Sequence, residues 1–334
     1  MLRERSIHGF HMRPALLVLI GALVAPVFGQ TQPASQPASQ PTTAATRPVI
    51  YDPAADGKKQ IAAALESAKR ENRRVLVMFG GNWCGWCQRL HALFRDNKQI
   101  AKALLYEYDL VLVDIGRFDK QMDIPAKYDI ALKRAGVPFL TVLDAEGKLV
   151  ANQDSGALED GDHHDPEKVL AFLNRWKAEP RDAEKVVAEA LRQAAAADKR
   201  VFLHLGAPWC PWCRKLDAFL AQREVAELLA RDFVDLKIDV DRMTKGPEVA
   251  KRFRLAEKGG IPWFAVLDAQ GKVLATSDGP KGNIGFPSEP EEITFFSGML
   301  KKNGKRLDAA QLGQIEEALR QAAKSAQSQP ADKH

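Results

Sequence analysis

The 334-residue chain has only four cysteines and no large excess of charge of one sign. A small scaffold held by disulfides needs cysteine above roughly 8% of a short chain, so disulfides do not hold this fold together. The formal net charge is +5, whereas a dedicated nucleic-acid-binding protein is expected to carry a clustered basic face. The composition therefore argues against both classes of protein, and the length favours about two domains.

Long apolar runs are missing beyond the N-terminal region. Residues 15–28 form one apolar run behind a basic start. This run is shorter than the roughly 20 apolar residues that span a bilayer, and the arrangement is typical of a secretory signal peptide. We therefore expect residues 1–29 to be a cleaved signal peptide, the mature protein to be periplasmic or extracellular, and no stable membrane insertion after cleavage. An uncleaved N-terminal anchor is the alternative.

Two segments lack any hydrophobic period. Residues 30–50 repeat a Gln-Pro-Ala-Ser unit, and residues 326–334 are polar. Such segments bury too little apolar surface to offset the entropy lost on ordering. We expect a disordered linker over 30–50, which acts as a tether, and a disordered tail over 326–334.

The chain repeats itself. Residues 73–94 match residues 199–220, and residues 135–150 match residues 259–274, at nearly the same offset. The repeated unit is far longer than a solenoid repeat, so it indicates duplication of a whole domain. We expect a first domain over 51–178 and a second over 180–325, the second with a C-terminal helix.

Both copies show the same order of patterns. Each begins with an amphipathic stretch, 58–71 or 183–197, that predicts a helix. A buried strand follows, then a helix, then a second apolar run that ends in an aspartate. Each copy closes with a strand, a turn, a strand and a last helix that begins near a proline. Strands that alternate with helices predict an α/β fold.

All four cysteines lie in two Cys-X-X-Cys motifs, each of which opens a predicted helix directly after a strand. The motifs are Cys84-Gly85-Trp86-Cys87 and Cys210-Pro211-Trp212-Cys213. The first thiol of each pair lies at the positive end of a helix, which favours its thiolate. The second thiol is one helical turn further on, close enough to resolve a mixed disulfide. The spacing therefore favours reversible disulfide chemistry.

This pattern resembles the thioredoxin family. In both copies a strand, a Trp-Cys-X-X-Cys motif and a helix are followed some fifty residues later by Val-Pro or Ile-Pro at the start of a strand. The short Trp-Cys-X-Trp-Cys versions look like exported bacterial thioredoxin-like proteins. The resemblance implies two tandem thioredoxin folds, each a central mixed sheet flanked by helices, and a thiol:disulfide oxidoreductase that serves cell redox homeostasis.

The resemblance also implies roles for residues. Cys84 and Cys210 would be the attacking nucleophiles, and Cys87 and Cys213 the resolving thiols. The residues implied to bind substrate flank the cysteines in space: Trp83, Val137, Pro138, Trp209, Ile261 and Pro262, with Pro138 and Pro262 at the family's cis-proline position. No bound cofactor or metal is implied. The implied partners are extracytoplasmic protein thiols and disulfides and a membrane electron carrier of the DsbD or DsbB kind.

The chain departs from the family at one buried position. Thioredoxins carry an aspartate six residues before the first cysteine, where this chain has Met78 and His204. The first domain thus lacks that base. In the second, an imidazole would replace it, although a core histidine hydrogen-bonded to backbone is the favoured interpretation.

Other uses of the motifs are weaker alternatives. A c-type haem site needs histidine after the second cysteine, where Gln88 and Arg214 stand, and a shared zinc site needs closer spacing than that between Cys87 and Cys210. Copper(I) bound by a cysteine pair stays open because thiolates suit this ion, and so does a binding module whose cysteines remain oxidised. The direction of electron flow also stays open, because potentials in this family run from about −270 to −120 mV.

A metal-like cluster of two histidines and an aspartate lies between the motifs, at residues 163–165. We expect it to be a solvated polar loop in which Asp165 caps the following helix.

Overall fold

The computed structural model describes residues 48–254 and 260–328. The predicted signal peptide, all but the last three residues of the linker, and residues 329–334 lie outside the described residues. None of the helices among the described residues is long and apolar enough to cross a membrane.

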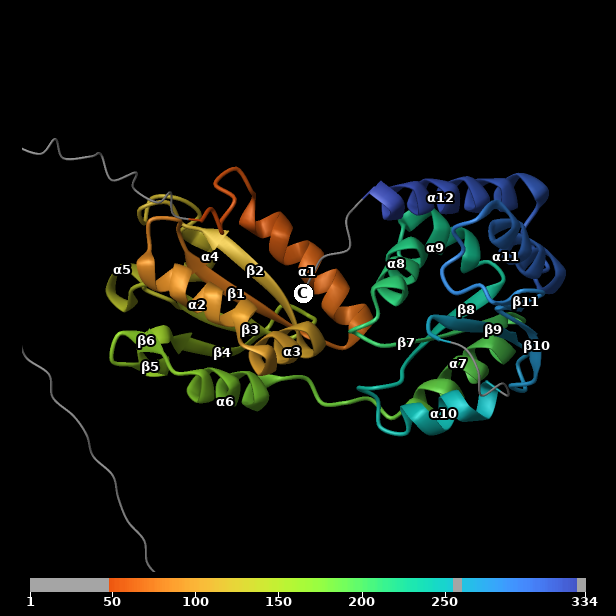
Figure 1. The fold of residues 1–334 in the computed structure, drawn as a ribbon, viewed down its shortest axis with the longest axis horizontal. Helices are drawn as coiled ribbons and strands as arrows, with labels where there is room; N and C mark the ends of the chain where they lie inside the picture. The colour runs from red at the N-terminus through yellow and green to blue at the C-terminus, as the bar shows by residue number, and fades with distance from the viewer. Residues whose placement is uncertain (1–47, 255–259, 329–334) are drawn as a thin grey trace, which may run out of the picture. The chain divides into compact units, whose positions relative to one another are not determined.

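The first domain is built around a four-stranded sheet of order β2-β1-β3-β4 (Figure 1). Its elements, in chain order, are α1 (Gly57–Glu71), β1 (Arg74–Gly80), α2 (Gly85–Asp96), α3 (Lys98–Glu107), β2 (Tyr108–Asp114), α4 (Asp123–Lys127), α5 (Leu132–Ala135), β3 (Phe139–Leu143), β4 (Leu149–Asp154), η1 (Ser155–Leu158), β5 (Glu159–Asp160), β6 (His163–His164) and α6 (Pro166–Trp176). β1 runs parallel to β2 and antiparallel to β3, so the sheet is mixed.

Strand alternation divides this domain into two cores. Val75, Val77 and Phe79 of β1 face α1, whereas Leu76 and Met78 face α2, α3 and α6. Since side chains of a strand alternate between faces, β1 is apolar at nearly every position because both faces of the sheet are covered.

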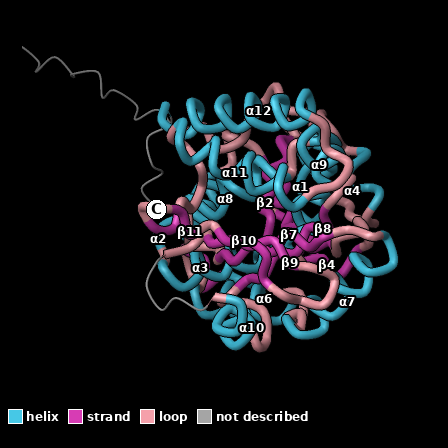
Figure 2. Tube along the Cα trace, turned by 90° about the vertical axis from the view of Figure 1, so that its right-hand side faces the viewer, coloured by secondary structure: helices cyan, strands magenta, loops and turns pink. Residues whose placement is uncertain are grey.

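The second domain repeats this plan around a sheet of order β10-β9-β7-β8. Its elements are α7 (Ala183–Ala197), β7 (Arg200–Gly206), α8 (Pro211–Leu220), α9 (Arg223–Leu229), β8 (Phe233–Asp239), α10 (Gly246–Phe253), β9 (Trp263–Leu267), β10 (Val273–Thr276), β11 (Asp278–Gly279), β12 (Gly282–Asn283), α11 (Pro290–Asn303) and α12 (Ala309–Ser328). The strands lie inside a layer of helices (Figure 2). The predicted α/β class, with mixed sheets flanked by helices, is confirmed.

α12 has no counterpart in the first domain. It packs on α8, α9 and α11 (Figure 1), and its Leu319 and Ile315 are fully buried in the core that contains Phe296. The predicted C-terminal helix is therefore present. It runs to Ser328, past residue 326, where the sequence predicted that the disordered tail begins.

Aspartate side chains cap the N-termini of two of the predicted helices. Asp182 begins α7 by accepting from the backbone N–H groups of Glu184 and Lys185, and Asp165 begins α6 in the same way. Such a cap satisfies amide groups that otherwise have no partner at a helix start. The cap expected at Asp165 is confirmed. The sequence did not predict α3, α9 or the hairpins β5-β6 and β11-β12.

Candidate active site

The first cysteine pair forms a disulfide at the N-terminus of α2. Cys84 is the N-cap residue, and its sulfur accepts the backbone N–H of Cys87 at 3.0 Å. The side chains of both cysteines are buried, with exposed fractions of 4% and 0%. A helix N-terminus stabilises negative charge, so the reduced Cys84 has a partner for its thiolate already in place.

The second pair repeats this geometry at the N-terminus of α8. Cys210 is the N-cap residue, its sulfur accepts the N–H of Cys213 at 3.1 Å, and the two form a disulfide. Pro211 occupies the first helical position, where its missing N–H costs nothing. The two sites are therefore built by the same local rule.

A proline loop approaches each disulfide from a distant part of the chain. The Val137–Pro138 and Ile261–Pro262 peptide bonds are cis. The Val137 carbonyl oxygen lies 3.6 Å from the sulfur of Cys84, and the Ile261 oxygen lies 3.5 Å from the sulfur of Cys210. The residues that the resemblance grouped together are thus brought together in both domains.

The tryptophans around the first site are partly covered. The Trp83 indole N–H donates to the Gly116 carbonyl at 2.5 Å. Trp86 and His164 pack in a T-shaped pair, with ring centroids 5.2 Å apart, and the Arg89 guanidinium carbon lies over the Trp86 ring, 4.7 Å from its centroid. Arg89 and a hairpin therefore cover much of Trp86.

The tryptophans around the second site are more open. Trp209 is 52% exposed and donates to the Asp241 carboxylate at 2.7 Å. Trp212 is 46% exposed, stacks on Phe286 and carries the Lys215 ammonium over its ring. The second site therefore offers a larger apolar contact surface beside its disulfide than the first.

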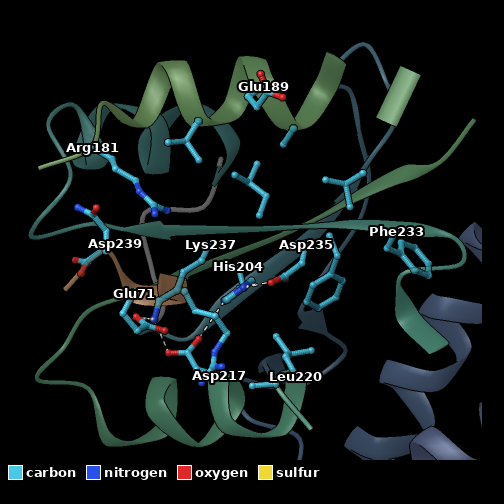
Figure 3. Close-up of a pocket in the computed structure, with 18 of the residues that line it drawn as sticks. Glu71, Arg181, Glu189, His204, Asp217, Leu220, Phe233, Asp235, Lys237 and Asp239 are labelled. Carbon is cyan, nitrogen blue, oxygen red and sulfur yellow. Dashed lines mark hydrogen bonds and ion pairs between the residues drawn. The ribbon is translucent and has the colours of Figure 1, made fainter. Parts of the chain in front are cut away.

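His204 is buried on β7 between two carboxylates, as Figure 3 shows. Its Nδ1 lies 3.4 Å from Asp217 of α8, and its Nε2 lies 3.1 Å from Asp235 of β8. Burial opposes the charging of the imidazole, but the two carboxylates outweigh burial, and the pKa of His204 is raised above its usual value. The prediction that His204 is hydrogen-bonded to backbone is wrong, because the strand register places the ring beside the carboxylates of Asp217 and Asp235.

Lys237 extends this cluster. Its ammonium group lies 2.7 Å from Asp217 and also contacts Glu71 of α1 (Figure 3). The side chains line a cavity of about 440 Å³ beside β8. Burial lowers the pKa of Lys237, but the carboxylates of Asp217 and Glu71 raise it more, so the ammonium stays charged.

His163 and His164 differ from each other. His163 is exposed, as expected, but His164 is buried with an exposed fraction of 3%. Burial, then the charge of Arg89, lowers the pKa of His164 to about 4, so the ring is neutral at neutral pH. The expectation of a solvated loop is wrong for His164, because the β5-β6 hairpin folds this ring onto Trp86.

Sequence reasoning missed Tyr51. The ring is fully buried among the residues around the first disulfide. The side-chain amide of Asn82 fixes its backbone: it accepts from the N–H groups of Ile50 and Tyr51 and donates to the Tyr51 carbonyl, all within 2.9 Å. Asn82 stands two residues before Cys84, and the corresponding residue of the other copy is Pro208. This difference between two otherwise similar motifs was the sequence feature that could have pointed to a special role for Asn82.

Across residues 48–254 and 260–328, no group of three or more histidine, cysteine, aspartate or glutamate side chains is arranged to hold a metal ion.

The family model described as thioredoxin-like matches residues 56–145 and 182–269, which together exceed half of the chain. The chain therefore belongs to the thioredoxin-like family. The two matches fall one in each domain, so the protein contains two thioredoxin-like domains in tandem. The resemblance read from the motifs is confirmed.

Individual proteins that resemble this chain share little sequence identity with it. Protein disulfide-isomerase erp38 of Neurospora crassa is 22% identical over 231 residues, which are 68% of this chain and 58% of the relative. A disulphide isomerase from Xylella fastidiosa Temecula1 is 26% identical, with a TM-score of 0.35 and coverage of 38% of this chain and 96% of that chain. The DsbD C-terminal domain of Neisseria meningitidis, in its oxidised form, is 15% identical, with a TM-score of 0.29 and coverage of 37% and 97%. The chain thus spans less than two thirds of its curated relative.

Proposed function

We propose that this protein is an exported thiol:disulfide oxidoreductase that exchanges disulfides with extracytoplasmic proteins through two active sites. The observation that supports this most is the duplicated geometry: each disulfide lies at a helix N-terminus, with a cis-proline loop carbonyl within 3.6 Å of the first sulfur. The relative named as a protein disulfide-isomerase supports the same chemistry.

The reaction begins at the N-cap cysteine. In the reducing direction, the thiolate of Cys84 or Cys210 attacks one sulfur of a substrate disulfide, forms a new S–S bond to it, and expels the other substrate sulfur as a thiolate. The thiolate of Cys87 or Cys213 then attacks the first cysteine's sulfur and releases the remaining substrate thiolate. The protein dithiol is oxidised by two electrons and the substrate disulfide is reduced by two, and the oxidising direction is the reverse.

The cis-proline loop and the tryptophans would hold the substrate. The backbone of Val137 or Ile261, beside the attacking sulfur, would bind an extended substrate segment as an added strand. Trp83 and Trp209 would contact the same segment. No cofactor is needed for the exchange itself, and a membrane electron carrier of the DsbD or DsbB kind would restore the working redox state.

Insulin reduction by dithiothreitol tests this proposal. The wild-type protein should accelerate the reduction, and Cys84→Ser/Cys210→Ser should react at the rate of dithiothreitol alone, since neither site can attack. Each single substitution should retain the activity of the other site. Equal rates for the wild type and the double variant would overturn the proposal and favour a binding module.

A further inference from the structure

Tyr51 carries a hydroxyl group that the fold buries without a partner. Its exposed fraction is 0%, and its oxygen has no hydrogen-bond partner among the described residues. A buried polar group left unpaired destabilises the fold, and such groups are rare in native proteins.

The hydroxyl lies near the sulfur of Cys87. A methyl group built on Gly80 would lie 2.3 Å from the Tyr51 oxygen and 2.6 Å from the Cys87 sulfur. The two atoms are therefore separated by no more than the sum of these distances, across space that glycine leaves open. The three hydrogen bonds of Asn82 to the backbone of residues 50 and 51 hold the segment that carries this ring.

The Tyr51 hydroxyl can donate a hydrogen bond to Cys87. Burial raises the pKa of Tyr51, and the Asp114 carboxylate raises it further, so the phenol keeps its proton. Asp114, the charged group acting on the hydroxyl, is itself paired with Lys120 at 3.8 Å. A protonated phenol donates a hydrogen bond to a thiolate more strongly than to the neutral sulfur of a disulfide.

The second domain lacks this arrangement. Among the described residues, a methyl group built on Gly206, the counterpart of Gly80, would have only atoms of Cys213 within 4 Å. Pro208 replaces Asn82, and Lys177 stands where the repeat would place the tyrosine. The hydroxyl is thus specific to the first site.

We propose that Tyr51 is a positioning residue of the first site, whose hydroxyl donates a hydrogen bond to the Cys87 thiolate once the disulfide opens. The hydroxyl then favours the reduced pair over the disulfide and makes the first site more oxidising. This inference rests on the proposed function only in that the pair must cycle between its redox states.

A glutathione redox titration tests the inference in a Cys210→Ser/Cys213→Ser background, where the Cys84–Cys87 pair titrates alone. Tyr51→Phe removes only the oxygen. It should shift the equilibrium constant roughly tenfold toward the disulfide, which corresponds to about 30 mV toward a more negative potential. The pKa of the Cys87 thiol, followed by alkylation of the reduced protein, should rise by about one unit.

Tyr108→Phe is the matched control. The Tyr108 hydroxyl is buried in the same core but donates to the Leu173 carbonyl at 2.6 Å. Tyr108→Phe should therefore lower the free energy of unfolding and leave the redox equilibrium unchanged. Tyr51→Phe should not lower the free energy of unfolding of the oxidised protein, because the oxygen that it removes has no hydrogen-bond partner there. An equilibrium constant for Tyr51→Phe within twofold of the parent, or an equal shift in both variants, would overturn the inference.

Asn82→Ala provides a second route to the same result. It releases the backbone of Tyr51 and should shift the equilibrium in the same direction as Tyr51→Phe. The titration needs no protein substrate, so it separates the two proposals. If Tyr51→Phe shifts the redox equilibrium but the protein does not accelerate insulin reduction, the proposed function alone is overturned. If the protein accelerates insulin reduction but Tyr51→Phe leaves the equilibrium unchanged, the role of Tyr51 alone is overturned.

Discussion

Gly80 lies against both Tyr51 and Cys87 in the first site. Lack of space, not backbone conformation, requires glycine at this position, because a side chain there would collide with the Tyr51 hydroxyl and the Cys87 sulfur. Overpacking a buried site costs about 1–3 kcal/mol. The absence of a side chain at Gly80 thus allows the Cys87 sulfur and the Tyr51 hydroxyl to lie close together.

Gly80→Ala should lower the free energy of unfolding by about 2 kcal/mol, because the added methyl group must displace a ring or a sulfur. Gly85→Ala is the matched control, since a methyl group there would meet nothing within 4 Å in the first turn of α2. It should be neutral or stabilise by about 0.5 kcal/mol. Urea denaturation measures both, and equal losses would contradict the close approach at Gly80.

At the scale of elements, each of two buried histidines joins neighbouring segments. His204 of β7 joins α8 to β8 through Asp217 and Asp235, and His164 of β6 packs the hairpin onto Trp86 of α2. The first imidazole is held beside carboxylates, and the second beside the Arg89 cation. The same side chain therefore stabilises its neighbours in opposite protonation states.

The two histidines should give opposite pH dependences of stability. The pKa of His204 is raised on folding, so its contribution is complete below about pH 6.5 and is lost as the pH rises through the folded value. The pKa of His164 falls to about 4 on folding, so stability is lost as the pH falls from about 6.5 to 4. His204→Gln should remove the loss at higher pH and His164→Gln the loss in acid, as measured by denaturation at several pH values. An unchanged pH profile in either variant would refute the role of that ring.

At the scale of the whole molecule, Arg242 links the two domains. Its guanidinium group donates to the carbonyls of Glu71 and Asn72, at the C-terminal end of α1, and to the Glu107 carboxylate. The last carbonyls of a helix lack partners within the helix, so a cation there satisfies both their hydrogen bonds and the helix dipole. The second domain thus supplies the cap for a helix of the first.

Arg242→Ala should lower the free energy of unfolding by about 2–3 kcal/mol, since several hydrogen bonds to a charged group are lost and Glu107 loses its partner. It should also separate the unfolding of the domains into two denaturant transitions. Arg252→Ala is the control, because this ion pair with Glu184 lies on the surface within one domain and should cost below about 1 kcal/mol. A single transition with unchanged midpoint for Arg242→Ala would contradict the link.

The sequence by itself determined the duplication, the α/β class and the two cysteine motifs. Apolar runs such as Val75–Phe79, the capping aspartates and the Cys-X-X-Cys spacing are local patterns, so they predicted β1, α6, α7 and the cysteine pairs without knowledge of distant contacts. The hairpin β5-β6 escaped prediction because its short strands are polar and form through the pairing of Glu159 with His164, which leaves no apolar period.

Only the tertiary structure decided what surrounds each disulfide. Tyr51 reaches Cys87 across 36 residues of sequence, and the partners of His204 come from α8 and β8. These contacts depend on strand register and on which side chains face one another across the sheet, and a one-residue shift would reverse the faces. The two copies therefore share their cysteine chemistry by sequence, while the buried polar group beside each pair is set by packing.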